Sequence, residues 1–147
     1  PMGEAGDSLG KTDIKELHEL FRRFPNNRFL VTALARESQH ELTATARIFN
    51  NVLLFGCWWF LNNPVFEREM TRMRYEMLGP KFVAQHSDAN MVGHMIGKWE
   101  RFKPILAEVL CENYLDLFSL GYRPDDEQVR REIADLFGGY FLKFIGR

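Results

Sequence analysis

Four histidines are the side chains in this sequence best suited to proton transfer or metal ligation. His18 and His40 have acidic neighbours, which is typical of a helix surface. His86 opens a turn, and His94 lies among apolar residues. A histidine in such a place either completes a core or ligates a metal. Because neutral imidazole is the usual protein ligand of haem iron, axial ligation is the chemistry that these residues could perform.

Other signatures of chemistry are missing from the sequence. Cys57 and Cys111 are the only cysteines, and no Cys-x-x-Cys motif marks a zinc or redox site. We expect two buried thiols in a reducing, cytoplasmic compartment. No Gly-rich phosphate loop, Gly-x-Ser-x-Gly or His-Glu-x-x-His motif is present. The sequence therefore predicts a protein that is not an enzyme.

Composition narrows the classes of partner. The chain has 147 residues, a net charge of -1 and a pI near 6.5, which gives no electrostatic reason to expect nucleic acid or a membrane surface as a partner. The first residues lack the apolar segment of a signal peptide. Aromatic residues make up 14% of the chain, which suits either an ordinary core or a pocket for a flat apolar ligand.

The sequence pattern predicts that the elements positioning these residues are helices. Residues 1–11 are polar and Gly-rich, and we expect them to be disordered. A helix begins near Asp13, and a second helical region is expected over 28–61. It ends in the uncharged run 52–61, which is too short to cross a bilayer and which we interpret as the last turns of a buried central helix.

The rest of the chain continues the helical pattern. Asn63 and Pro64 predict the start of a helix over 64–78, whose charged residues we expect to face solvent. Further helices are expected from residues 91 and 104, and a last one from 124, with Gly138 inside it as a site of close packing. The sequence thus predicts an all-α single domain of six to seven helices over 12–147.

The second half of the chain resembles a globin. His94 precedes Phe102 by eight residues, a long apolar helix follows Phe102, and a final helix closes the chain. This order is similar to a proximal histidine followed by the last two globin helices. The resemblance implies a globin-like fold that binds haem and senses a diatomic gas or a redox state. A homodimer is a further expectation.

The globin resemblance also implies a set of site residues. His86 or His94 would be the proximal iron ligand, and His40 the distal one. The walls of the haem pocket would be aromatic residues: Phe29, Trp58 and Phe102.

Two alternatives remain open. The stretch 20–27 and the helix after it resemble the junction behind the recognition helix of TetR-type repressors, which implies a ligand-binding and dimerisation domain. Residues 50–52 and 97–102 resemble two motifs of Bcl-2-like proteins, which implies a helical protein-interaction module without haem.

Overall fold

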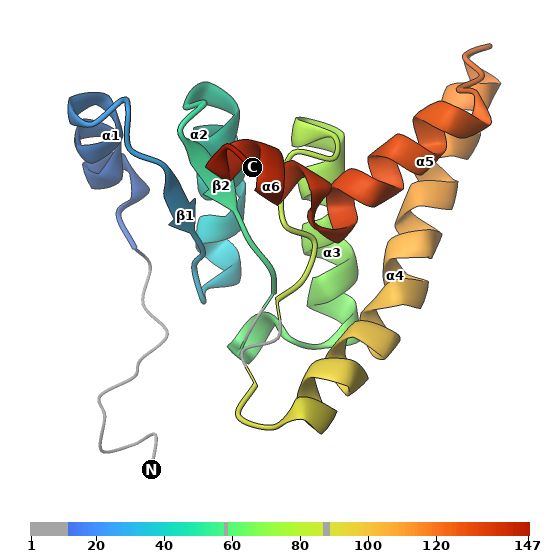
Figure 1. Ribbon diagram of the computed structural model, residues 1–147, viewed down its shortest axis with the longest axis horizontal. Helices are drawn as coiled ribbons and strands as arrows, with labels where there is room; N and C mark the ends of the chain where they lie inside the picture. The colour runs from blue at the N-terminus through green and yellow to red at the C-terminus, as the bar shows by residue number, and fades with distance from the viewer. Residues whose placement is uncertain (1–11, 58, 87–88) are drawn as a thin grey trace.

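The fold combines helices with a small parallel sheet (Figure 1). A computed structural model describes residues 12–57, 59–86 and 89–147. The longer helices, in chain order, are α1 (Ile14–Arg23), α2 (Gln39–Ile48), α3 (Pro64–Leu78), α4 (Val92–Ser119), α5 (Asp126–Ala134) and α6 (Tyr140–Ile145). The shorter elements are β1 (Phe29–Val31), η1 (Arg36–Ser38), β2 (Val52–Leu54), η2 (Trp59–Leu61) and η3 (Asp135–Gly139). The predicted disordered segment 1–11 lies outside the described residues, and the single domain over 12–147 stays a prediction.

Strands and helices alternate in the first half of the chain. β1 pairs in parallel with β2, with Phe29 opposite Val52, and α2 connects them. A further parallel bridge joins Phe55 to Val83 beyond α3. The N–H of Val83 donates to the carbonyl of Leu54 at 2.9 Å. Three parallel segments therefore lie side by side in chain order, each followed by a helix, which is the pattern of consecutive β/α units.

The predicted central helix is wrong. Residues 52–54 form β2, and all three are buried. Phe55 continues the strand with a parallel bridge to Val83, and η2 begins at Trp59. A strand of a parallel sheet is covered on both faces, so its sequence is continuously apolar. A short apolar run of this kind does not distinguish a strand from a buried helix.

Helix α3 is confirmed at both predicted ends. The Asn63 side chain accepts a hydrogen bond from the N–H of Phe66, and Pro64 occupies the first turn, where its missing N–H costs nothing. Gly79, at a φ of 60°, ends the helix. The N-terminal helix is also confirmed, as α1, with Asp13 as its N-cap.

The C-terminal helices run alongside one another. α4 and α5 form an antiparallel pair, and α6 follows α5 toward the start of β2 (Figure 1). Gly138 has a φ of 115°, so the helix predicted to continue through it breaks there. The residue that we expected to permit close packing instead marks a kink between α5 and α6.

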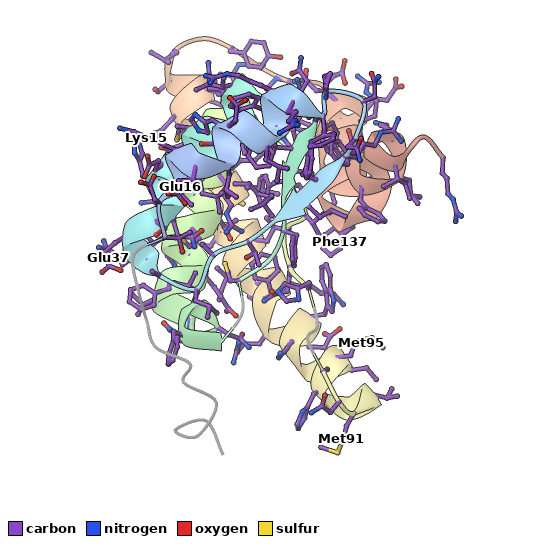
Figure 2. The ribbon with its side chains drawn as sticks, turned by 90° about the vertical axis from the view of Figure 1, so that its left-hand side faces the viewer. Lys15, Glu16, Glu37, Met91, Met95 and Phe137 are labelled. Carbon is purple, nitrogen blue, oxygen red and sulfur yellow. The ribbon has the colours of Figure 1, made fainter. Side chains whose placement is uncertain are left out.

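The core lies between the sheet and the helices. One buried apolar cluster reaches from Ile14 in α1 through Leu54 in β2 to Leu106 in α4 and Leu136. Met91 and Met95 project from the first turns of α4, away from the sheet (Figure 2), and are 60% and 43% exposed. No helix among the described residues has the length and apolar character needed to span a membrane.

The all-α, globin-like fold class is therefore wrong. A globin packs helix on helix, whereas here β1 and β2 form a parallel sheet with helices connecting its strands. The reason for the error is local: the apolar residues of β1 and β2 were attributed to one long helical region.

Candidate functional site

The candidate site lies where the carboxyl ends of the three parallel segments meet. In parallel β/α proteins the loops that leave these ends usually form the ligand-binding site. Here they are residues 32–35 after β1, 55–57 after β2 and 84–86 after Val83. Figure 1 shows η2 and the start of α4 gathered at this same end of the molecule.

Helix α3 places two charged side chains behind these segments. Glu67 and Arg74 are seven residues apart, so they lie on the same face of the helix. Their exposed fractions are 0% and 1%, and the buried Met70 lies between them on that face. We expected these charges to face solvent, and the structure shows that they face the sheet instead.

Arg74 connects the ends of the first two strands. Its NH1 donates to the carbonyl of Gly56 at 2.6 Å, and its NH2 donates to Oε1 of Gln39 at 2.8 Å. The Gln39 amide in turn donates to the carbonyls of Ala33 at 2.7 Å and Ala35 at 3.3 Å. One buried guanidinium thus holds backbone groups that follow both β1 and β2.

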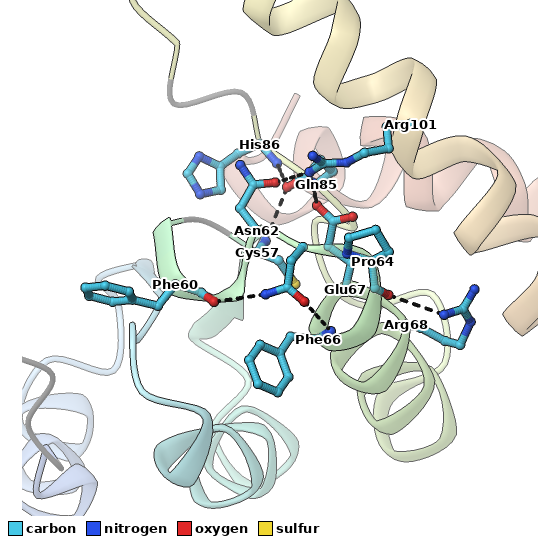
Figure 3. Close-up of polar contacts among 11 residues, drawn as sticks. Cys57, Phe60, Asn62, Pro64, Phe66, Glu67, Arg68, Gln85, His86 and Arg101 are labelled. Carbon is cyan, nitrogen blue, oxygen red and sulfur yellow. Dashed lines mark hydrogen bonds and ion pairs between the residues drawn. The ribbon is translucent and has the colours of Figure 1, made fainter.

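Glu67 connects the ends of the second and third segments (Figure 3). Its Oε1 accepts hydrogen bonds from Nε2 of Gln85 at 3.3 Å and from Arg101 at 2.7 Å. Oε1 of Gln85 accepts from the backbone N–H groups of Cys57 at 3.3 Å and of His86 at 3.0 Å. The carboxylate therefore reaches the strand ends through the Gln85 amide and reaches α4 through Arg101.

Gly56 brings the second and third segments into direct contact. Its φ is 54°, in the region that favours glycine. A Cβ at this position would overlap Cδ2 of His86, so the imidazole packs directly on the glycine backbone. The ring of Phe55 lies 5.0 Å from the His86 ring, centroid to centroid, at 68°.

Burial dominates the electrostatics of this cluster. It lowers the pKa of the Arg74 guanidinium, an effect opposed by the neighbouring Cys57 thiol, and the arginine stays protonated. Burial also raises the pKa of Cys57, although Arg74 opposes this. Arg74 and Arg101 carry two positive charges against the one negative charge of Glu67 in this described cluster, and the excess suits an anionic ligand.

Two further polar groups at this end, Arg101 and His86, are less deeply buried than Arg74 and Glu67. The Arg101 side chain is 43% exposed, and besides Glu67 it donates to Oδ1 of Asn62. His86 is partly buried. Arg101 offers a planar cation for a carboxylate, and His86 offers a group that can carry a proton near neutral pH.

The three predicted iron ligands come from different elements. His40 is exposed on α2, His86 follows the third segment, and His94 is exposed in the first turns of α4. Among the residues that the structure describes, no group of three or more His, Cys, Asp or Glu side chains is placed to hold a metal ion. Only His86 lies at the carboxyl ends of the strands.

The predicted pocket walls are also separated. Phe29 is partly buried in β1, where its ring lies 5.0 Å from that of Phe21. Phe102 is fully buried in α4 and belongs to the core. Trp58 lies outside the described residues.

Sequence reasoning missed the residues that hold this site together: Gln39, Glu67, Arg74, Gln85 and Arg101. One available signal was the position of Glu67 and Arg74 on the same helical face as Met70, an apolar residue. Their partners lie 18 to 35 positions away in the chain, and no local pattern indicates them.

A second polar cluster joins the helices away from the strand ends. Oε2 of Glu132 in α5 accepts hydrogen bonds from the hydroxyls of Tyr75 at 2.6 Å and Tyr114 at 2.8 Å, and Gln128 donates to Oε1 at 3.1 Å. Burial alone would raise the pKa of Glu132, but these three donors together hold it below its ordinary value. The cluster links α3, α4 and α5 by side chains alone.

The two cysteines are in different environments. Both are free thiols, but Cys57 is 1% exposed beside Arg74, whereas Cys111 is exposed on α4. Cys111 lines an apolar groove of about 410 Å³ between α4 and α5, together with Leu110 and Phe137. The prediction of two buried thiols is therefore wrong for Cys111.

The order of strands and helices places this chain among parallel α/β proteins. No protein-family model matches it, and no curated protein matches it. Among solved structures it is similar to a uronate isomerase from Bacillus halodurans C-125, whose crystal structure was determined at 2.00 Å resolution. The two are 50% identical with a TM-score of 0.93, and the match covers 99% of this chain and 35% of that one. The chain thus spans about a third of the length of that enzyme.

This match overturns the functional predictions made from the sequence. The globin family, haem as cofactor and gas or redox sensing are wrong, because the fold is that of part of a uronate isomerase. The TetR-type domain and the helical interaction module are wrong for the same reason. The expectation of a protein that is not an enzyme is contradicted by the enzymatic nature of the similar structure. The predicted partners, namely haem, a diatomic gas and a homodimer, find no support in the match.

Proposed function

We propose that this chain is part of a uronate isomerase and contributes residues to the site where the sugar acid is isomerised. The observation that carries this proposal is the 50% identity sustained over 99% of the chain at a TM-score of 0.93. A similar fold alone would be a weak argument, because one fold serves many functions. Here the likeness extends to half of the side chains, over a whole set of strands, helices and loops.

The fraction of the uronate isomerase that this chain matches agrees with the number of β/α units in the chain, if the enzyme is a parallel β/α barrel. The described part of the chain contains three successive β/α units, beginning at β1, at β2 and at the segment around Val83. A parallel β/α barrel has about eight such units, so three are roughly three-eighths of it. That fraction is close to the 35% of the uronate isomerase that the chain covers. We infer that the chain forms this arc of the barrel.

Arg101 and His86 at the strand ends suit a uronate. The substrate carries a carboxylate, and its isomerisation moves a hydrogen between carbon atoms, which calls for a general acid or base. We assign Arg101, exposed over 43% of its side chain, to the carboxylate. We assign His86, held against the backbone of Gly56, to proton transfer. The excess positive charge of the cluster attracts the anion.

A chimeric enzyme tests the proposal. This chain replaces the matching 35% of the Bacillus halodurans enzyme, and conversion of D-glucuronate into an isomer is followed by NMR. We expect the chimera to isomerise the sugar acid and to leave glucose, which lacks the carboxylate, unchanged. A folded chimera without isomerase activity would contradict the proposal, and the unmodified enzyme serves as the positive control.

Two variants of the chimera test the residue assignments. Arg101→Met should raise the KM for D-glucuronate by about tenfold or more, because a charge-assisted hydrogen bond to the substrate is lost. His86→Gln should lower kcat by at least about 10²-fold, the usual contribution of a general acid or base. Unchanged kinetics in either variant would remove that residue from the site.

We also propose that the protein acts in the cytoplasm. The support is that Cys57 and Cys111 are both free thiols, as expected in a reducing compartment.

A further inference from the structure

Two buried charges on α3 call for an explanation beyond packing. Glu67 and Arg74 are almost completely removed from solvent. Burying an ion is costly, and apolar residues of similar size often give equal or greater stability. Oε2 of Glu67 and Nε of Arg74 have no hydrogen-bond partner among the described residues, so the burial is not fully compensated. We therefore look for a role of Glu67 and Arg74 other than stabilising the core.

Their partners are the backbone groups of the strand ends. The peptide unit between Gly56 and Cys57 is held from both sides: Arg74 donates to its carbonyl, and Oε1 of Gln85 accepts from its N–H. Gln85 is itself held by Glu67 and also accepts the N–H of His86. The network thus fixes backbone positions at the ends of the second and third segments.

The same network extends to the end of the first strand. Gln39 accepts a hydrogen bond from Arg74 and donates to the carbonyls of Ala33 and Ala35. All three segments that leave the parallel strands are therefore connected through the two charges on α3. Arg101 adds α4, the element that offers the accessible cation.

We propose that Arg74 and Glu67 are positioning residues, which fix the three strand-end segments relative to one another and so set the geometry of the catalytic site. This inference rests on the proposed function. Neither side chain touches a substrate, because both are enclosed by α3 and the strand ends. They act through the Gly56–Cys57 peptide and through the imidazole that packs on Gly56. A misplacement of about 1 Å in such a site can cost about 10²-fold in rate.

Amide hydrogen exchange on the 147-residue chain tests the positioning directly. In Arg74→Met we expect the N–H groups of Cys57 and His86 to exchange at least about tenfold faster, while amides inside α4, such as that of Val109, keep their rates. Arg74→Lys keeps the charge and one donor and should show a smaller increase. The matched control is Arg72→Met. Arg72 belongs to the same helix as Arg74, but its side chain is exposed.

Two patterns of amide exchange rates would overturn the inference. Equal acceleration of all amides would mean that Arg74 contributes only to global stability, and unchanged rates at Cys57 and His86 would mean that it positions nothing. Glu67→Gln provides the same comparison if Arg74→Met fails to fold, because its amide keeps the shape of the side chain and removes the charge.

Kinetics in the chimera then connect positioning to catalysis. Below the melting temperature of each variant, Arg74→Met should lower kcat/KM by about 10²-fold, Arg74→Lys should recover part of the loss, and Arg72→Met should match the parent. An active chimera that is indifferent to Arg74 would overturn the inference and leave the proposed function intact. An inactive chimera would contradict the proposed function, and hydrogen exchange would still decide whether Arg74 positions the strand ends.

Discussion

The two polar clusters of this molecule differ in what they hold. The cluster around Arg74 and Glu67 has both of these charges buried, and its hydrogen bonds end on backbone carbonyls and N–H groups of three strand-end segments. The cluster around Glu132 is partly buried, and its bonds join the hydroxyls of Tyr75 and Tyr114 to one carboxylate. The first sets the path of the main chain, and the second connects helices through their side chains.

This difference indicates where precision is needed. A side-chain link between helices tolerates small shifts, because both partners can rotate. A backbone group held on each side cannot move without losing a hydrogen bond in a buried place, where that loss is expensive. We therefore expect the strand ends to be the more rigid part of the molecule, which suits the proposed site. Five predictions test this comparison.

The largest effect is expected at the buried arginine. Arg74→Met leaves the carbonyl of Gly56 and Oε1 of Gln39 without their donor, and should lower the free energy of unfolding by about 3–5 kcal/mol. Arg72→Met removes only an exposed ion pair with Glu112 of α4, and should change it by about 0–1 kcal/mol. Urea unfolding of both variants measures the difference. Equal losses would mean that the buried network contributes no more than a surface ion pair.

The next effect separates backbone conformation from close packing. Gly56 and Gly79 have similar positive φ values, 54° and 60°, but only at Gly56 would a Cβ meet another atom, in His86. Gly79→Ala should cost about 1–3 kcal/mol for the conformation alone. Gly56→Ala should cost at least about 1 kcal/mol more, and should shift the imidazole NMR signals of His86. Equal costs would show that the imidazole does not pack on the glycine.

The Glu132 cluster should respond to alkaline pH. Burial raises the pKa of Tyr114 to about 12, with help from Glu132 and opposition from Tyr75. Tyrosine in the unfolded chain ionises near pH 10. The stabilisation is therefore present below about pH 10 and is lost as the pH rises toward 12. Between pH 8 and pH 11 the free energy of unfolding should fall further in the natural chain than in Tyr114→Phe. The difference should be up to about 1 kcal/mol after solvent screening.

The same cluster should respond to acid with the opposite sign. Because the folded pKa of Glu132 is lowered, its contribution is present above the ordinary pKa of a glutamate and is lost as the pH falls through the folded value. Glu132→Gln should remove this part of the acid dependence. An identical acid and alkaline response in the variants and the natural chain would show that the tyrosines and Glu132 are not coupled.

The smallest effect is expected on the solvent side of α3. Arg68 donates to Glu108 of α4 at 2.7 Å, but both side chains are more than a third exposed. A double-mutant cycle with Arg68→Met and Glu108→Gln should give a coupling energy of about 0.2–1 kcal/mol, and 1 M salt should reduce it. A larger, salt-independent coupling would place this ion pair in the same class as the buried network.

Much of the fold could be predicted where the signals are local. Asn63 and Pro64 give the start of α3, and Asp13 gives the start of α1, because caps depend only on neighbouring residues. The apolar run 52–61 could not be assigned in the same way. Its pattern suits a buried helix as well as β2, and only the pairing with β1 decides between them.

The site was harder to predict than the fold. Glu67 and Arg74 are of the residue types most often found at the surface, and the partners that justify their burial come from the ends of different strands. His86 could be singled out as a residue capable of chemistry, but its contact with Gly56 depends on the positive φ of that glycine. The apolar neighbours of His94 were enough to suggest a haem ligand, whereas the structure leaves His94 exposed in the first turns of α4.

Because the two thiols differ in exposure, one of them can be labelled selectively. Cys57 is enclosed, and burial raises its pKa, so it reacts slowly with thiol reagents while the protein is folded. Cys111 is exposed, so a maleimide dye attaches there first. Such a dye reports from the groove between α4 and α5, and the later reaction of Cys57 records the opening of the strand ends.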